Sequence, residues 1–245
     1  MTQESSLILV LLKINRYTDS QDMLVFACIS PHPPLLLPHI GGETDRARVK
    51  ETISSLEKLA PELAKTKPDL IIVSSPHPDW GIEVPLFFLV SKLKTQIKIL
   101  DYQNPADFKL IEPDKLTVQP ILTTLDSPKK HFGWGKEITA NLPKEKRVAW
   151  IASGDMSHRL KKDGPYGLHP SGPKFDQKFI GLLKKKNIEA ILSLNSNLIE
   201  EAGECGLRSF CLLLGALEEK NINWQPKILS YEGPFGVGYL VARLL

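Results

Sequence analysis

The chain has 245 residues, enough for one large domain or two small ones, and its 42% hydrophobic and 24% charged residues are typical of soluble globular proteins. A net charge of +3 without any long basic run argues against a nucleic-acid-binding protein. No apolar run reaches the roughly 18 residues that a bilayer-spanning helix needs. Three cysteines are too few for a disulfide framework. We therefore expect a reducing, cytoplasmic location, with neither nucleic acid nor a membrane as partner.

The first 22 residues differ in character from the rest of the chain. The apolar run at residues 6–12 is preceded by Glu4 and by no Lys or Arg, so it lacks the positive start of a secretory signal. Residues 13–22 are polar. We expect residues 1–22 to be a poorly structured extension that carries no chemistry, and residues 23–245 to form a single domain.

From Met23 onward, short apolar runs alternate with segments of helical periodicity. This alternation predicts an α/β fold, with a mostly parallel or mixed central sheet and helices on both faces, in three layers. Pro61 is expected to kink or split the first helix. The predicted strands are residues 24–30, 70–75, 97–100 and 148–153, with a closing pair at 227–231 and 237–242. The predicted helices are residues 43–65, 174–194 in two pieces, and 204–218.

Residues 102–147 show the least regular pattern. Five prolines interrupt them, and proline disfavours both helix interiors and inner strands. We expect this stretch to form an excursion or a hairpin off the main sheet.

Histidines follow the ends of three predicted strands. The tetrapeptide Ser-Pro-His-Pro occurs twice, placing His32 and His77 after the first and second strands, and His158 follows the strand at 148–153. Ligand sites of open α/β sheets form outside the carboxyl ends of the strands. The flanking prolines restrict the backbone on both sides of His32 and His77, which suits metal ligands that must be placed in advance. We therefore expect these two histidines to share a metal site.

A third ligand is needed, and the sequence offers three candidates. Glu204 and Cys205 are adjacent, between glycines and at the start of a predicted helix, and Glu232 follows a predicted strand. Two histidines and a carboxylate form the ligand set of many non-haem Fe(II) oxygenases. Zn²⁺ accepts the same ligands. From the residues alone, both metals stay open.

Four motifs, in this order along the chain, resemble those of the class III extradiol ring-cleaving dioxygenases, the superfamily of the LigB catalytic subunit. The similarity extends over nearly all of residues 23–245. The motifs are Ser30-Pro31-His32-Pro33-Pro34, Ser75-Pro76-His77-Pro78, Ser153-Gly154-Asp155-Met156-Ser157-His158-Arg159-Leu160 and Glu204-Cys205-Gly206-Leu207-Arg208.

The resemblance implies a role for each matched residue. His32 and His77 correspond to the histidine ligands of Fe(II), and His158 to the histidine that acts as acid–base catalyst. The third ligand is Glu in the dioxygenases and Cys in the related Memo proteins. We expect Glu204, with Cys205 and Glu232 as alternates, because Fe(II) bound by histidines usually takes a carboxylate.

Residues around this set are expected to support it. Asp155 or Ser157 would orient the imidazole of His158. Trp80 and Tyr166 would line the substrate pocket, and residues 161–170 would form a loop over the site.

The resemblance also implies a reaction. An Fe(II)-dependent extradiol dioxygenase opens a catechol-like ring next to the diol, so its partners would be a small aromatic substrate and O₂. The alternatives are a Memo-like metal-binding accessory or redox protein, and a zinc hydrolase. The family further suggests homo-oligomers, which no apolar stripe here requires, and a functional link to a radical-SAM enzyme and a partner domain.

Overall fold

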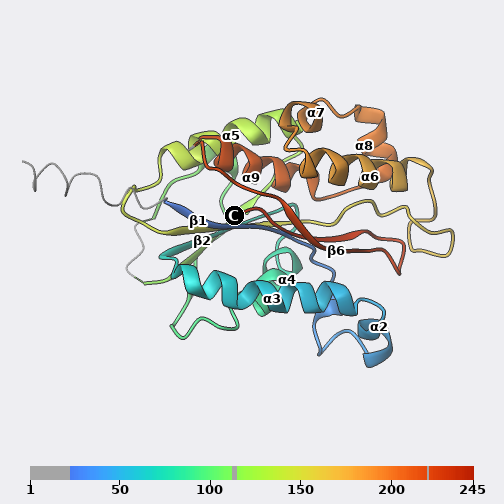
Figure 1. The fold of residues 1–245 in the computed structure, drawn as a ribbon, viewed down its shortest axis with the longest axis horizontal. Helices are drawn as coiled ribbons and strands as arrows, with labels where there is room; N and C mark the ends of the chain where they lie inside the picture. The colour runs from blue at the N-terminus through green and yellow to red at the C-terminus, as the bar shows by residue number, and fades with distance from the viewer. Residues whose placement is uncertain (1–22, 112–114, 220) are drawn as a thin grey trace, which may run out of the picture.

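The computed structural model describes residues 23–111, 115–219 and 221–245, and its centre is a seven-stranded sheet between two layers of helices (Figure 1). The predicted extension at residues 1–22 lies outside the described residues. The strand order is β3-β4-β2-β5-β1-β7-β6, in which the first five strands are parallel and β7 runs antiparallel to both neighbours. The α/β fold with a mixed sheet is therefore confirmed. The strands are β1 (Leu24–Ser30), β2 (Leu70–Ser75), β3 (Lys98–Ile99), β4 (Thr117–Leu122), β5 (Val148–Ser153), β6 (Lys227–Glu232) and β7 (Tyr239–Arg243).

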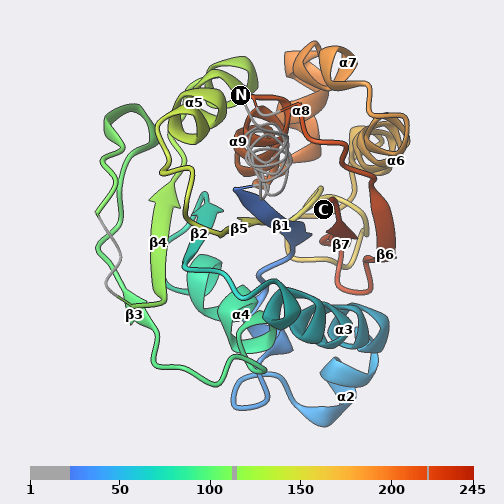
Figure 2. The same cartoon turned by 60° about the vertical axis from the view of Figure 1, so that its left-hand side comes forward.

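Alternate residues of the inner strands face two separate hydrophobic cores, as the two-residue period of a strand requires. In β5, Trp150 packs into one core while Ile151 packs into the other. Figures 1 and 2 show α5 to α9 over one face and α2 to α4 over the other. The helices are α2 (Glu43–Ala47), α3 (Lys50–Thr66), α4 (Trp80–Leu89), α5 (Pro128–Ala140), α6 (Ser171–Lys184), α7 (Ile188–Leu192), α8 (Ser196–Ala202) and α9 (Leu207–Glu219), with short 3-10 turns at Pro34–Leu36 and Pro105–Asp107. Within the described ranges, no helix combines the length and apolar character needed to cross a bilayer.

The first predicted helix is divided, but the division is not at Pro61. The helix predicted at 43–65 divides between α2 and α3, whereas Pro61 lies inside α3. Pro61 and Glu57, whose carbonyl loses its helical partner, are both exposed, so water can bind that carbonyl.

The prediction that residues 102–147 leave the sheet is wrong. This stretch contains β4, which lies between β3 and β2, and α5, which packs closely on α9. Pro120 is inside β4 opposite Val73, and its carbonyl accepts a hydrogen bond from the backbone N–H of Gln103. Because proline is rare in inner strands, the sequence pattern of this stretch did not indicate a strand.

Two glycines bring α5 and α9 into close contact. A Cβ added at Gly135 would lie 2.0 Å from the carbonyl oxygen of Leu212, and one at Gly215 would lie 2.1 Å from that of Phe132. We expect Gly135→Ala to lower the free energy of unfolding by about 3 kcal/mol, because rigid backbone must move apart. Urea unfolding followed by circular dichroism measures this.

Gly181, inside α6, is the matched control, since no atom lies within 4 Å of an added Cβ there. Gly181→Ala should stabilise the protein by roughly 0.5–1 kcal/mol through helix propensity alone. Equal effects of the two substitutions would contradict the close helix crossing.

Candidate metal centre

Three neighbouring parallel strands end at the same edge of the sheet and carry the predicted site residues. β5 lies between β1 and β2, with Ser153 paired to Ser30 and Ala152 paired to Ser74. Because the pairing holds to the last residues, the segments that follow the three strands emerge side by side. His32, His77 and His158 belong to these segments, as expected for an α/β ligand site.

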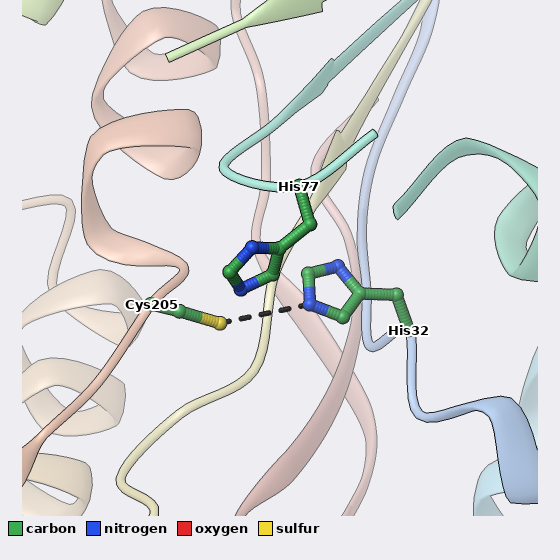
Figure 3. Close-up of side chains that lie close together, drawn as sticks. All are labelled: His32, His77 and Cys205. Carbon is green, nitrogen blue, oxygen red and sulfur yellow. Dashed lines mark hydrogen bonds between the residues drawn. The ribbon is translucent and has the colours of Figure 1, made fainter. Parts of the chain in front are cut away.

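The structure brings His32, His77 and Cys205 together (Figure 3). The two imidazole centroids are 5.3 Å apart with an interplanar angle of 69°. Cys205 Sγ lies 3.6 Å from His32 Nε2. One ligand atom from each residue lies within 4.8 Å of those of the other two, so a single ion could bind all three. Two imidazoles and a thiolate suit a divalent transition metal such as iron or zinc.

Glu204 and Glu232 have other partners in the structure. Glu204 Oε2 accepts a 2.6 Å hydrogen bond from the backbone N–H of Leu207, the first residue of α9. Glu204 Oε1 lies 3.9 Å from the guanidinium of Arg208 and has no hydrogen-bond partner among the described residues. Glu232 accepts two hydrogen bonds from Thr52, from its backbone N–H and its hydroxyl. Neither carboxylate belongs to the metal-ligand groups found among the described residues, whereas Cys205 does.

Two glycines allow the loop of Cys205 to approach the end of β5. A Cβ at Gly154 would lie 2.2 Å from the Cα of Gly206, so the two backbones are in direct contact. The backbone N–H groups of Cys205 and Gly206 both donate to the carbonyl oxygen of Asp155, at 3.4 and 2.9 Å. These bonds hold the thiol beside His32.

His32 is buried, and hydrogen bonds fix both its ring and its backbone. Its Nδ1 is 3.0 Å from the hydroxyl of Ser153, and its backbone N–H donates to the carboxylate of Asp155. If Nδ1 carries the proton and donates it to Ser153, Nε2 is free to bind a metal, as in most histidine-metal sites. Burial, aided by the nearby His77, lowers the pKa of His32 to about 3, so its imidazole is neutral at physiological pH. Asp155, and not Glu204, is the carboxylate that lies next to His32, with 3.9 Å between Oδ2 and Nε2.

His158 faces the same cavity with an unused nitrogen. Its Nε2 is buried and has no hydrogen-bond partner among the described residues. Its ring centroid lies 5.1 Å from that of Tyr166. Burial lowers the pKa of His158, and the opposing effect of Asp155 is smaller. The hydroxyl of Ser157 donates to the carbonyl of Ala202 and accepts from the backbone N–H of Arg159, so these bonds brace the backbone on both sides of His158.

A cavity of about 300 Å³ opens beside these residues. His32, His77, Asp155 and His158 form its polar side. Trp80 and Tyr166, expected as pocket residues, are in its wall. Pro33 and Pro34 of the first motif and Pro165 of the loop expected over the site are also in the wall. Sequence reasoning missed Val237 and Tyr239, which complete it.

Asp176, which sequence reasoning also missed, supports the segment that carries His158. This carboxylate is 1% exposed; it accepts a 2.8 Å hydrogen bond from the backbone N–H of Ser157 and another from the hydroxyl of Tyr231. It therefore joins α6 and β6 to the residue before His158. Burial raises the pKa of Asp176 to about 6, although both hydrogen bonds oppose this shift.

The raised pKa makes Asp176 a source of pH-dependent stability. Between pH 4 and 6 the folded protein keeps a proton on this group that the unfolded chain has lost, so its contribution falls as pH rises. We expect the stability of Asp176→Asn relative to the wild type to increase by about 3 kcal/mol from pH 4 to pH 7. Urea unfolding at several pH values measures this, and a difference that does not change with pH would contradict it.

Comparison with known families identifies the chain. The model for the "Catalytic LigB subunit of aromatic ring-opening dioxygenase" matches residues 77–242. The chain belongs to the LigB family. The match confirms the resemblance that the strand-end motifs indicated, and it includes His77, His158 and Cys205, while His32 precedes it.

Two individual proteins are also similar to this chain. Protein CA_C1420 of Clostridium acetobutylicum is 29% identical over 266 aligned residues, which cover 87% of this chain and 56% of that protein. The chain thus spans about half the length of that relative, whose name states no activity. The crystal structure of the uncharacterized protein JW3007 from Escherichia coli K12 is similar, with a TM-score of 0.52 and 14% identity, over 90% of this chain and 100% of that one. This likeness supports the fold.

Proposed function

We propose that this LigB-family protein is a non-haem Fe(II)-dependent extradiol dioxygenase that cleaves a catechol-like ring next to its diol. The observation that carries the proposal is that His32, His77 and Cys205 lie together beside a cavity that His158 also lines, with an Nε2 that has no hydrogen-bond partner among the described residues. The family match supports aromatic ring opening as the type of reaction.

The residues present fit an iron site. His32, His77 and Cys205 would hold the ion, with Cys205 in the place where we expected Glu204. When bound, Fe(II) with three protein ligands supplies open coordination positions and the redox chemistry that dioxygen activation requires. The hydroxyl of Ser153 would fix the orientation of the His32 imidazole.

His158 is suited to move the proton of the substrate. Because burial lowers its pKa, its imidazole is neutral at physiological pH and can accept a proton from a catechol hydroxyl at Nε2. The same nitrogen can return the proton as the ring opens. The apolar wall of the cavity, including Pro33 and Val237, would hold the ring and exclude water.

Oxygen consumption tests the proposal. Protein reconstituted anaerobically with Fe(II) should take up one O₂ for each catechol consumed, and with isotopically labelled O₂ both labelled atoms should appear in the ring-opened product. The measurements are an oxygen electrode and mass spectrometry. Bound iron without oxygen uptake across a panel of substituted catechols would overturn the proposal.

Cys205 favours one other function. A thiol at the third position matches the Memo proteins, so a metal-binding accessory or redox role is the second candidate. This accessory role predicts bound metal, no turnover of catechols and a requirement for Cys205.

A zinc hydrolase is a further alternative, because the same three side chains can bind Zn²⁺. Metal analysis of the purified protein, together with activity assays on a panel of esters and amides, tests it.

A further inference from the structure

The cavity beside the metal-binding residues has no positively charged wall. Among the described residues, no Lys or Arg side chain lines it. The wall has one carboxylate, Asp155, which is buried and bonded to the backbone N–H of His32. In the proposed function the three imidazoles already serve as metal ligands and as base, so they are not available to pair with an anionic substituent.

Arg48 binds a turn that leads into the cavity wall. Val237, in the wall, follows a turn that includes Pro234 and Phe235. The guanidinium of Arg48 lies 4.2 Å from the centroid of the Phe235 ring and donates a 2.8 Å hydrogen bond to the carbonyl of Pro234. Arg48 thus binds the turn and is not part of the cavity wall.

The remainder of the wall is apolar or aromatic, and the space is small. Pro33, Pro34, Pro165 and Val237 present hydrocarbon surface, and Tyr239 is 2% exposed. A volume of about 300 Å³ is at the lower end of the roughly 300–1,000 Å³ typical of ligand pockets. It suits a single ring with a short substituent.

We propose that the cavity accepts catechols with uncharged, apolar substituents and discriminates against catechols that carry a carboxylate. This rests on the proposed function, because the diol must occupy the metal end. A carboxylate on the ring would then lose its hydration against a wall that offers it no cation, with Asp155 nearby. We expect a difference in affinity of about 10- to 100-fold, the range measured for hydrogen bonds to charged groups.

The matched probes are 4-methylcatechol and 3,4-dihydroxybenzoate, which differ by a methyl group and a carboxylate at the same ring position. Anaerobic isothermal titration of the full chain loaded with Fe(II) measures both affinities. The methyl compound should bind at least tenfold more tightly. Equal binding, or tighter binding of the acid, would overturn the substrate class and leave the proposed reaction standing. Binding of neither compound would count against the reaction itself, and the substrate class would fall with it.

A charge placed in the wall should reverse the preference. Tyr166 lines the cavity and is 60% exposed, so Tyr166→Arg can place a guanidinium at the mouth without disturbing a core. It should strengthen binding of the acid at least tenfold relative to the methyl compound. Leu168→Arg is the control, because Leu168 is exposed nearby but outside the wall. If both variants shifted the ratio equally, the preference would come from long-range charge, and the proposed recognition by the wall would be wrong.

Discussion

Cys205→Ala is expected to weaken metal binding by more than about 100-fold. Loss of an outer partner of a metal ligand already costs roughly 10- to 100-fold, and Cys205 is placed to bind the ion directly, with Sγ 3.6 Å from His32 Nε2. Metal content after anaerobic reconstitution, by plasma mass spectrometry, and competition with a chelator measure the loss.

The matched control is the adjacent residue. Glu204→Gln keeps an oxygen that can accept the hydrogen bond from the backbone N–H of Leu207, so this first N–H of α9 keeps its partner. We expect its metal affinity to stay within a fewfold of the wild type. If Glu204→Gln lost the metal and Cys205→Ala retained it, the ligand would be Glu204, as we expected from the sequence.

His158→Gln is expected to lower kcat by about 10²- to 10⁴-fold while metal content stays unchanged. This is the usual contribution of a positioned acid–base group. His158 is not in the group of His32, His77 and Cys205, but with Asp155 and Cys205 it forms a second group that could hold a metal ion, so retained metal would also argue against that second group. Oxygen uptake with saturating catechol, together with metal analysis of the same sample, separates catalysis from metal loss. His39→Gln, in an exposed loop, is the control and should retain activity.

The pH profile gives a second measurement on the same variant. Burial lowers the pKa of His158. Protonation of this base should therefore reduce kcat/KM only at pH values below about 6.5, the ordinary pKa of histidine. This acidic limb should be absent from the residual activity of His158→Gln. A limb that survives the substitution would assign the proton transfer to another group.

Several strands were predictable because they follow local patterns. The bounds predicted for β1, β2 and β5 agree with the structure, since each is a short apolar run bounded by polar residues or turn residues. β4 was not predicted, because Pro120 is an inner-strand residue whose carbonyl still finds a partner in Gln103. Gln103 lies outside β4, so the local sequence around Pro120 does not indicate this hydrogen bond.

Two of the proposed ligands could be identified from the sequence alone. His32 and His77 follow strand ends and are flanked by prolines, so their position and local rigidity depend only on neighbouring residues. Once the strands were predicted to be parallel, their convergence followed from the shared edge of the sheet.

Only the tertiary structure shows that Cys205, and not Glu204, lies beside His32 and His77. The two are adjacent in the chain, and their environments depend on a contact between Gly154 and Gly206, about 50 positions apart. The support from Asp176 and the lack of Lys and Arg in the described cavity wall likewise depend on residues from separate elements. Sequence patterns determine local conformation and which residues follow the end of each strand. Long-range packing decides which of two residues adjacent in the chain, such as Glu204 and Cys205, lies beside the two histidines.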